Sequence, residues 1–164
     1  MKNSNLRIIT FGVFDAFHIG HLNLFENIKK KFGYDCFLIV CVQSSENILK
    51  YKPNTQIFYD TAERVRIIKS LRCVDEVLIY DDVDIDILQI DFDIFVKGPD
   101  QNHQGFQNAV KYCEKQGKMV YTIQRTKNIS STLIKTSMPR TPDVCSTNTK
   151  SYLAGKELSK TEEN

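Results

Sequence analysis

The chain has 164 residues, a length that suits one domain with a sizeable hydrophobic core. Hydrophobic residues make up 41% and charged residues 26% of the sequence, as in ordinary globular proteins. The formal net charge is only +2, too small for nucleic-acid binding through bulk electrostatics. No apolar stretch approaches the length of a membrane-spanning helix, so neither nucleic acid nor a membrane is an expected partner.

The cysteines indicate a reducing environment. Five are present, none forms a C-x-x-C pair, and several lie within apolar runs. Their number is odd, and the chain begins without a signal peptide. We therefore predict a cytoplasmic protein whose thiols are buried and free.

Strands and helices are predicted to alternate along the first half of the chain. A strand is expected over residues 6–11, and apolar residues at helical spacing predict a helix over residues 19–31. The near-continuous apolar run over residues 36–42 is typical of a buried parallel strand. The polar segment 44–59, which contains Pro53, is expected to be a loop.

The second half of the chain continues this alternation. Asp60 or Thr61 is expected to cap a helix that ends at residue 72. The remaining predicted elements are strands over residues 77–80, 92–96 and 119–123, and helices over residues 84–90, 104–116 and 130–136. This order predicts an α/β protein, with a Rossmann-like three-layer α/β/α fold and a five-stranded parallel sheet.

The composition changes at Pro139. From there to the last residue, proline, serine, threonine, lysine and glutamate dominate, and few residues are apolar. We assign residues 1–138 to one domain and residues 139–164 to a poorly packed polar tail.

The segment GVFDAFHIGH, residues 12–21, directly follows the first predicted strand. Gly12 lets the backbone turn and approach a ligand closely. The helix that begins next offers free backbone N–H groups, and His18 and His21 add imidazole donors for phosphate oxygens. Gly20 leaves room for a base or ribose, and Asp15 is expected to orient a substrate or help hold a divalent ion. The segment therefore predicts a phosphate site.

These histidines also fit two other interpretations. They could be surface residues at the start of an ordinary capped helix, or ligands of a zinc ion. A zinc site needs ligands beyond two histidines at positions i and i+3, and the only other histidine is His103. For the complete motif after a strand, phosphate binding is the favoured interpretation.

A second motif, RTKNISST, occupies residues 125–132 after the last predicted strand. Two cations precede a Ser-Ser-Thr run that opens a helix, where hydroxyls and backbone N–H groups bind phosphate and Arg125 offers a forked donor. Taken alone, an ordinary helix cap would be the simpler interpretation. Ligands bind beyond the carboxyl ends of parallel strands, so both motifs are expected to line one crevice.

Three further groups of residues are candidates for the same crevice. Gly98 and Asp100 belong to the segment KGPD, which follows a predicted strand, and Asp100 either faces the crevice or fixes a turn. Lys50 and Lys52 lie on the predicted loop after the second strand. Arg64 lies in the first turns of the next predicted helix.

The two motifs resemble those of the cytidylyltransferase family of small nucleotidyltransferases, over about residues 6–135. The matching patterns are G-x-F-D-x-x-H-x-G-H and R-T-x-x-I-S-[ST]-[ST]. The first also marks adenylyltransferases and class I aminoacyl-tRNA synthetases, whereas the second is more specific to the cytidylyl branch. The resemblance implies CTP as substrate, Mg²⁺ as cofactor, a small phosphorylated alcohol, foremost glycerol 3-phosphate, as acceptor, and a homodimer.

The resemblance also implies roles for individual residues. His18 and His21 would stabilise the transition state, Lys52 and Arg64 would bind phosphates or the acceptor, and Arg125 would grip the nucleotide. Further contacts to base and phosphates are expected from Gly12, Val13, Phe14, Asp15, Gly20, Lys50, Gly98, Asp100, Thr126, Ile129, Ser130, Ser131 and Thr132. No residue is assigned as a metal ligand.

Some positions depart from the family pattern and leave the acceptor open. Val13 replaces a threonine or serine, and the segment after Asp100 lacks the family's aspartate–tryptophan pair. An adenylyltransferase of the same fold, acting on a sugar phosphate or flavin mononucleotide, stays an alternative, as does a non-catalytic nucleotide-binding regulator. A synthetase fragment is disfavoured, because the chain is too short for a tRNA-binding domain and lacks a strongly basic surface.

Overall fold

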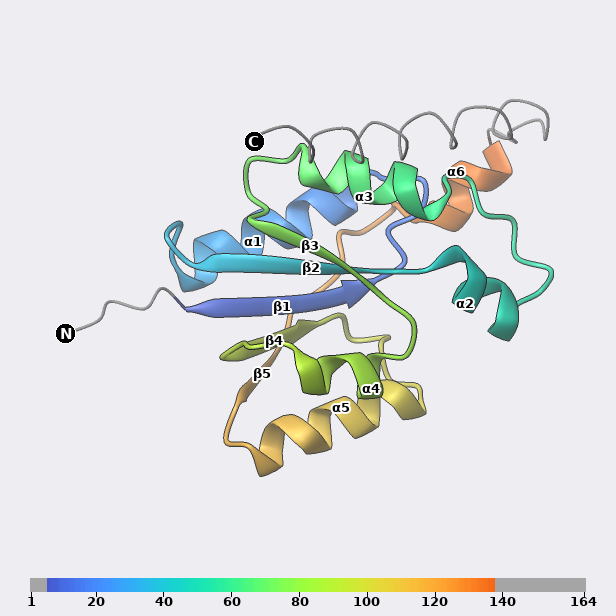
Figure 1. Cartoon of the computed structure of the whole chain (residues 1–164). Helices are drawn as coiled ribbons and strands as arrows, with labels where there is room; N and C mark the ends of the chain where they lie inside the picture. Colours follow the sequence, from blue (N-terminus) through green and yellow to red (C-terminus); the bar gives the residue numbers. More distant parts are fainter. Residues whose placement is uncertain (1–5, 138–164) are drawn as a thin grey trace, which may run out of the picture.

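The computed structural model describes residues 6–137, so the predicted polar tail over residues 139–164 and its boundary lie outside the described residues. Helices and strands alternate along the chain (Figure 1). In chain order they are β1 (Arg7–Gly12), α1 (Ile19–Phe32), β2 (Phe37–Gln43), α2 (Ser45–Tyr51), α3 (Thr61–Lys69), β3 (Glu76–Tyr80), α4 (Val83–Asp86), the short 3₁₀ helix η1 (Ile87–Gln89), β4 (Ile94–Lys97), α5 (Gln104–Lys115), β5 (Met119–Thr122) and α6 (Ser131–Ser137).

The five strands form one parallel sheet in the order β3-β2-β1-β4-β5. Strand β1 lies in the middle, where Ile9 is in register with Ile39 of β2 and with Phe95 of β4. Helices α1 and α3 cover one face of the sheet, and α4 and α5 cover the other (Figure 1). The predicted Rossmann-like three-layer fold is thereby confirmed. Strands β2 and β3 lie on one side of β1, and β4 and β5 lie on the other. The strand order thus reverses direction between β1 and β4, and the carboxyl ends of these two strands form the topological switch point.

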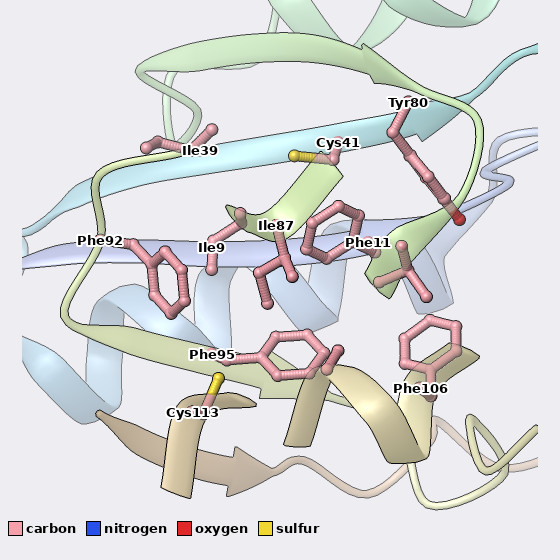
Figure 2. Close-up of a cluster of buried hydrophobic side chains, with 12 residues drawn as sticks. Ile9, Phe11, Ile39, Cys41, Tyr80, Ile87, Phe92, Phe95, Phe106 and Cys113 are labelled. Carbon is pink, nitrogen blue, oxygen red and sulfur yellow. The ribbon is translucent and has the colours of Figure 1, made fainter. Parts of the chain in front are cut away.

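The side chains of β1 alternate between two hydrophobic cores. Ile9 and Phe11 point toward α4 and α5, where the rings of Phe11 and Phe95 meet edge-on with centroids 5.8 Å apart (Figure 2). Ile8 points into the opposite core, which it shares with Phe25 of α1. Burial on both faces explains why the central strands are almost continuously apolar in sequence.

The prediction of a loop over residues 44–59 was wrong in its first half, which forms helix α2. Ser44 caps this helix, because its hydroxyl accepts the backbone N–H of Asn47 at 3.1 Å. Ile48 is buried and fixes the helix to the rest of the protein. The helix is short and mostly polar, so the cap is its only strong sequence signal. Pro53 lies beyond its end.

Helix α3 begins as predicted but ends earlier. The Asp60 carboxylate accepts the backbone N–H of Glu63 at 2.8 Å, and the Glu63 carboxylate accepts that of Asp60 at 3.0 Å. This reciprocal capping box fixes the first turn. The helix ends at Lys69 rather than at residue 72.

Among the described residues, all four cysteines carry free thiols. Cys36, Cys41 and Cys113 are buried as predicted, whereas Cys73 is partly exposed. Within residues 6–137, no helix has the length and apolar character needed to cross a membrane.

Candidate active site

Three segments that follow different strands meet at the switch point. GVFDAFHIGH follows β1, KGPD follows β4, and RTKNISST follows β5. The Ser131 hydroxyl donates to the backbone carbonyl of Asp15 at 2.7 Å, which joins the second motif to the first. Arg125 Nη2 lies 2.6 Å from Asp100 Oδ2, which joins it to KGPD. The segments that were expected to line one crevice therefore contact one another.

The first motif leaves β1 along a strained backbone. Phe14 and Ala16 have φ angles of 52° and 46°, in the left-handed region that residues with a Cβ seldom adopt. This turn folds the Phe14 ring back over Gly12, so that a Cβ at Gly12 would lie 2.7 Å from a ring carbon. Gly12 is thus required by the packing of Phe14, whereas the sequence had suggested a ligand approaching its backbone. Phe14 itself is buried, and Val13 is exposed.

His18 and His21 form a stacked pair at the start of α1. Their ring centroids are 3.9 Å apart, with an angle of 22° between the planes. His18 is the N-cap of α1, and its Nδ1 accepts the backbone N–H of Gly20 at 3.0 Å. A Cβ at Gly20 would lie 2.8 Å from the His18 ring and 3.2 Å from Ile129. Protein atoms therefore occupy the space that a side chain at Gly20 would take, so this space is not open for a base.

Both imidazoles are held neutral at pH 7. Burial, with smaller contributions from the nearby His18 and Arg125, lowers the pKa of His21 to about 3 against the opposing effect of Asp15. Burial and Arg125 likewise lower the pKa of His18. Because Nδ1 of neutral His18 accepts a hydrogen bond, its proton is on Nε2, which is left as a donor.

KGPD is tied to the sheet by a residue that the sequence did not single out. Gln101 accepts the backbone N–H of Gly98 at 2.7 Å and donates to the backbone carbonyl of Phe11 at 2.7 Å. The Asp100 carboxylate faces Arg125 of the second motif, which favours the first of the two roles considered for it. The side chains of Asp100 and Arg125 are 49% and 65% exposed, so the pair is accessible from solvent.

The second motif is held against α1 by one polar contact and is ordered by its own turn and helix cap. Asn23, which no sequence pattern singles out, donates to the Thr126 hydroxyl at 3.1 Å. The Ser130 hydroxyl accepts the backbone N–H of Leu133 at 3.2 Å and so caps the first turn of α6. Asn128, with a φ of 62°, occupies the left-handed turn between these contacts. Thr132 is exposed.

Asp15 points into the protein rather than into the crevice. Its carboxylate accepts backbone N–H groups from Ala16, Phe58 and Tyr59 at 2.7 to 2.9 Å. Lys135 Nζ lies 2.6 Å from Oδ2 of the same group. Burial alone would raise the pKa of Asp15, but the bonds from Lys135 and the backbone outweigh it, and the pKa lies below its usual value. In this arrangement the carboxylate, which was expected to orient substrate or help hold a divalent ion, is engaged by protein donors.

Arg64 is also directed inward, contrary to the expectation that it holds a ligand. Its side chain is fully buried, at 0% exposure. Its guanidinium donates to three backbone carbonyls and two hydroxyls at 2.7 to 3.4 Å; the acceptors are Val13, Gln43, Tyr59, Ser45 and Thr61. All five N–H groups of the guanidinium thus donate to protein oxygens, and none is left for a ligand. Arg64 joins the first motif to α2 and α3.

Lys50 and Lys52 are exposed at the end of α2. Lys50 lies in the last turn of the helix, with its ammonium 5.1 Å from the ring centroid of Tyr51. Lys52 closes the helix through its backbone N–H, which donates to the carbonyl of Ile48. Both ammonium groups are therefore accessible to an anionic ligand.

The described residues do not fit a metal site built by protein ligands alone. Within residues 6–137, no group of three or more histidine, cysteine or acidic side chains is placed to hold an ion. The carboxylates of Asp15, in the first motif, and of Asp100, in KGPD, each contact a cationic side chain. A Mg²⁺ ion at this crevice would need most of its ligands from phosphate oxygens and water.

A parallel sheet with paired neutral imidazoles and an arginine at its switch point defines a Rossmann-like nucleotide-binding domain. The chain belongs to the cytidylyltransferase-like family, whose sequence profile matches residues 9–137. By this relationship it is an enzyme of the nucleotidyltransferase class.

Named relatives come from several branches. Glycerol-3-phosphate cytidylyltransferase of Bacillus subtilis is 32% identical over 133 residues, which cover 79% of this chain and 94% of that protein. FAD synthase of Thermococcus sibiricus is 33% identical over 104 residues, covering 62% and 68%. Among solved structures, a lipopolysaccharide core biosynthesis protein from Thermoplasma volcanium has a TM-score of 0.57 at 25% identity, covering 76% of this chain and 98% of that one.

Proposed function

We propose that this enzyme transfers CMP from CTP to a small phosphorylated alcohol, glycerol 3-phosphate, and forms CDP-glycerol and pyrophosphate. Two glycerol-3-phosphate cytidylyltransferases, from Bacillus subtilis and Staphylococcus aureus, match at 32% and 30% identity over 133 residues. The observation that carries the proposal is the contact between the two motifs around the stacked imidazoles of His18 and His21.

The reaction needs alignment and charge stabilisation more than a strong base. A phosphate oxygen of the acceptor attacks the α-phosphorus of CTP, and pyrophosphate leaves in line. The attacking oxygen is already anionic, so no proton has to be removed from it. His18 can donate its Nε2–H to a phosphate oxygen as negative charge moves toward the leaving group, and neutral His21 adds a second imidazole.

Arg125 is proposed to exchange partners when nucleotide binds. Its guanidinium contacts Asp100 at 2.6 Å, and both side chains are accessible from solvent. A triphosphate carries more charge than one carboxylate and accepts the guanidinium fork through two oxygens, so it can displace Asp100. Asp100 and Gly98 then lie beside the nucleotide.

The remaining contacts divide between nucleotide and acceptor. Lys52, with Lys50 next to it, is proposed to bind the acceptor phosphate, because both ammonium groups are exposed. The second motif is proposed to grip base and phosphates through Thr126, Ile129, Ser130, Ser131 and Thr132. Asp15 and Arg64 are proposed to act indirectly, by holding the motifs in place.

Mg²⁺ is proposed to enter with the nucleotide. When bound, it would neutralise phosphate charge. The protein residues described above would supply few of its ligands, because Mg²⁺ usually binds through substrate phosphates and water. A homodimer is also proposed, and sedimentation velocity would give the mass of the assembly.

A second candidate is adenylyl transfer from ATP to flavin mononucleotide or a sugar phosphate. It is favoured by the match to FAD synthases, which are 33% identical over 104 residues in Thermococcus sibiricus and over 102 residues in Korarchaeum cryptofilum. The fold and the first motif fit either nucleotide. The second motif favours the cytidylyl branch by resemblance.

Pyrophosphate release across a matrix of nucleotides and acceptors tests the proposal. The nucleotides are CTP and ATP, and the acceptors are glycerol 3-phosphate, ribitol phosphate, choline phosphate and flavin mononucleotide. We expect the highest rate with CTP and glycerol 3-phosphate. The fastest release from ATP and flavin mononucleotide would establish the second candidate. CTP binding without release on any acceptor would point to a nucleotide-binding regulator.

A further inference from the structure

Lys135 makes two contacts that the proposed mechanism does not use. It lies in α6, and its side chain is only 17% exposed although lysine usually extends into solvent. Its ammonium lies 2.6 Å from the Asp15 carboxylate and donates to the backbone carbonyl of Gln56 at 2.8 Å. One cation thus bridges two segments that are far apart in sequence.

Helix α6 presents a second group to the same place. Ser131 and Lys135 are four residues apart, and this spacing puts them on one face of the helix. The Ser131 hydroxyl donates to the backbone carbonyl of Asp15, while Lys135 contacts its carboxylate. Helix α6 therefore contacts the first motif at both the backbone carbonyl and the side-chain carboxylate of Asp15.

The other groups on Asp15 extend this connection to a third segment. We call residues 52–60, between α2 and α3, the α2–α3 segment. The Asp15 carboxylate accepts the backbone N–H groups of Phe58 and Tyr59, each at 2.7 Å. Lys135 reaches the same segment at Gln56. Lys52, which begins the segment, accepts the backbone N–H of Thr55 at its carbonyl and starts the turn that leads there.

We propose that Lys135 is a positioning residue that fixes the α2–α3 segment, and with it Lys52, relative to the two nucleotide motifs. Lys135 neutralises a carboxylate that is itself 1% exposed, so the bonds from Phe58 and Tyr59 to that carboxylate depend on it. Loss of the cation loosens the segment and misplaces Lys52. The consequence for activity rests on the proposed function, since it concerns the acceptor rather than the nucleotide.

The first test is amide hydrogen exchange in the full-length protein, which does not require activity. Lys135→Met keeps the length of the side chain and removes its charge. We expect the amides of Phe58 and Tyr59 to exchange at least about tenfold faster, while those of α1 stay protected. Lys135→Arg, which keeps the cation, should restore most of the protection. The matched control is Lys111→Met, at an exposed position on α5, and it should exchange like the wild type.

The second test separates the acceptor from the nucleotide. In Lys135→Met we expect the KM for glycerol 3-phosphate to rise about tenfold, whereas the Kd for CTP changes less than about threefold. Unchanged exchange at Phe58 and Tyr59 would overturn the proposal. So would faster exchange spread evenly over the chain and not restored by Lys135→Arg. If the wild type forms no CDP-glycerol, the proposed function fails, and the exchange measurement still decides the role of Lys135.

Discussion

The rings of His18 and His21 stack with centroids 3.9 Å apart, and the protein holds both of them without charge. A proton on either ring would face the other ring and the Arg125 guanidinium, which explains part of the lowered pKa values. Bound phosphates would reverse this balance by placing negative charge at the pair. The arrangement therefore suits a site that receives a polyanion.

The pH dependence of stability should report the buried histidine. The pKa of His21 is about 3 in the folded protein and 6.5 ordinarily, so between these values the unfolded chain binds more protons. Stability consequently falls as the pH falls below 6.5, by up to about 1.4 kcal/mol per pH unit for one such group. The lowered pKa of Asp15 adds a further loss only below its ordinary value of 3.8.

The variant His21→Gln should flatten this dependence. Urea denaturation at several pH values between about 6 and 4 gives the free energy of unfolding, and the curve of the variant should decline less steeply than that of the wild type. The control His103→Gln removes an exposed imidazole before α5 and should follow the wild-type curve. Parallel curves for His21→Gln and the wild type would contradict the burial of an uncharged ring.

Turnover should depend on the Nε2–H donor of His18 and not on the hydrogen bond through which its Nδ1 caps α1. His18→Asn keeps an oxygen that can accept the Gly20 N–H, so α1 should remain capped. The variant loses the Nε2 donor, and kcat should fall about 10²–10³-fold. Steady-state kinetics and a thermal unfolding curve measure the two effects separately. Near-normal kcat in a folded variant would show that His18 has no part in the chemistry.

Removing Asp100 should tighten the binding of inorganic pyrophosphate. Asp100→Asn frees Arg125 from a partner with which it forms a largely exposed ion pair. Such pairs are worth roughly 0.2–1 kcal/mol, so the Kd should fall by up to about fivefold. Pyrophosphate has no base, and isothermal titration therefore isolates this exchange from any contact of Asp100 with the nucleoside. Weaker binding in the variant would contradict the proposed change of partners.

Arg64 should matter for stability before it matters for ligand binding. Its fully buried guanidinium donates to backbone carbonyls that include those of Val13 and Tyr59. Arg64→Met removes all five hydrogen bonds that this buried cation donates. Hydrogen bonds from a charged group are worth about 1.5–3 kcal/mol each, so a loss of at least about 3 kcal/mol is expected from denaturant unfolding. A stable variant with an intact Tm and weakened substrate binding would restore the ligand-binding role predicted from sequence.

The parallel sheet and the proximity of the motifs could be predicted because they follow from the hydrophobic pattern and from the alternation of strands and helices. Apolar runs such as residues 36–42 mark buried strands, and parallel strands bring their carboxyl ends to one edge. Helix α2 was missed because it is short and largely polar, and its identity rests on the Ser44 cap and on the burial of Ile48.

The direction in which a side chain points could not be predicted from residue type and spacing. Asp15 and Arg64 fit a binding site by their charge, yet both turn inward and satisfy backbone groups. Lys135 and Gln101 were not selected, because isolated lysines and glutamines are usually solvated and their partners lie far away in sequence. Their roles depend on tertiary contacts that carry no local signal.

The central claim is cytidylyl transfer to a polyol phosphate, and the most direct test compares nucleotides with one acceptor. The kcat/KM values for CTP and ATP are measured with glycerol 3-phosphate, and the product is identified by mass spectrometry. We predict CDP-glycerol as the product and a preference for CTP of at least about 100-fold, as expected of a site that hydrogen-bonds the base. Equal use of both nucleotides, or a preference for ATP, would contradict the claim.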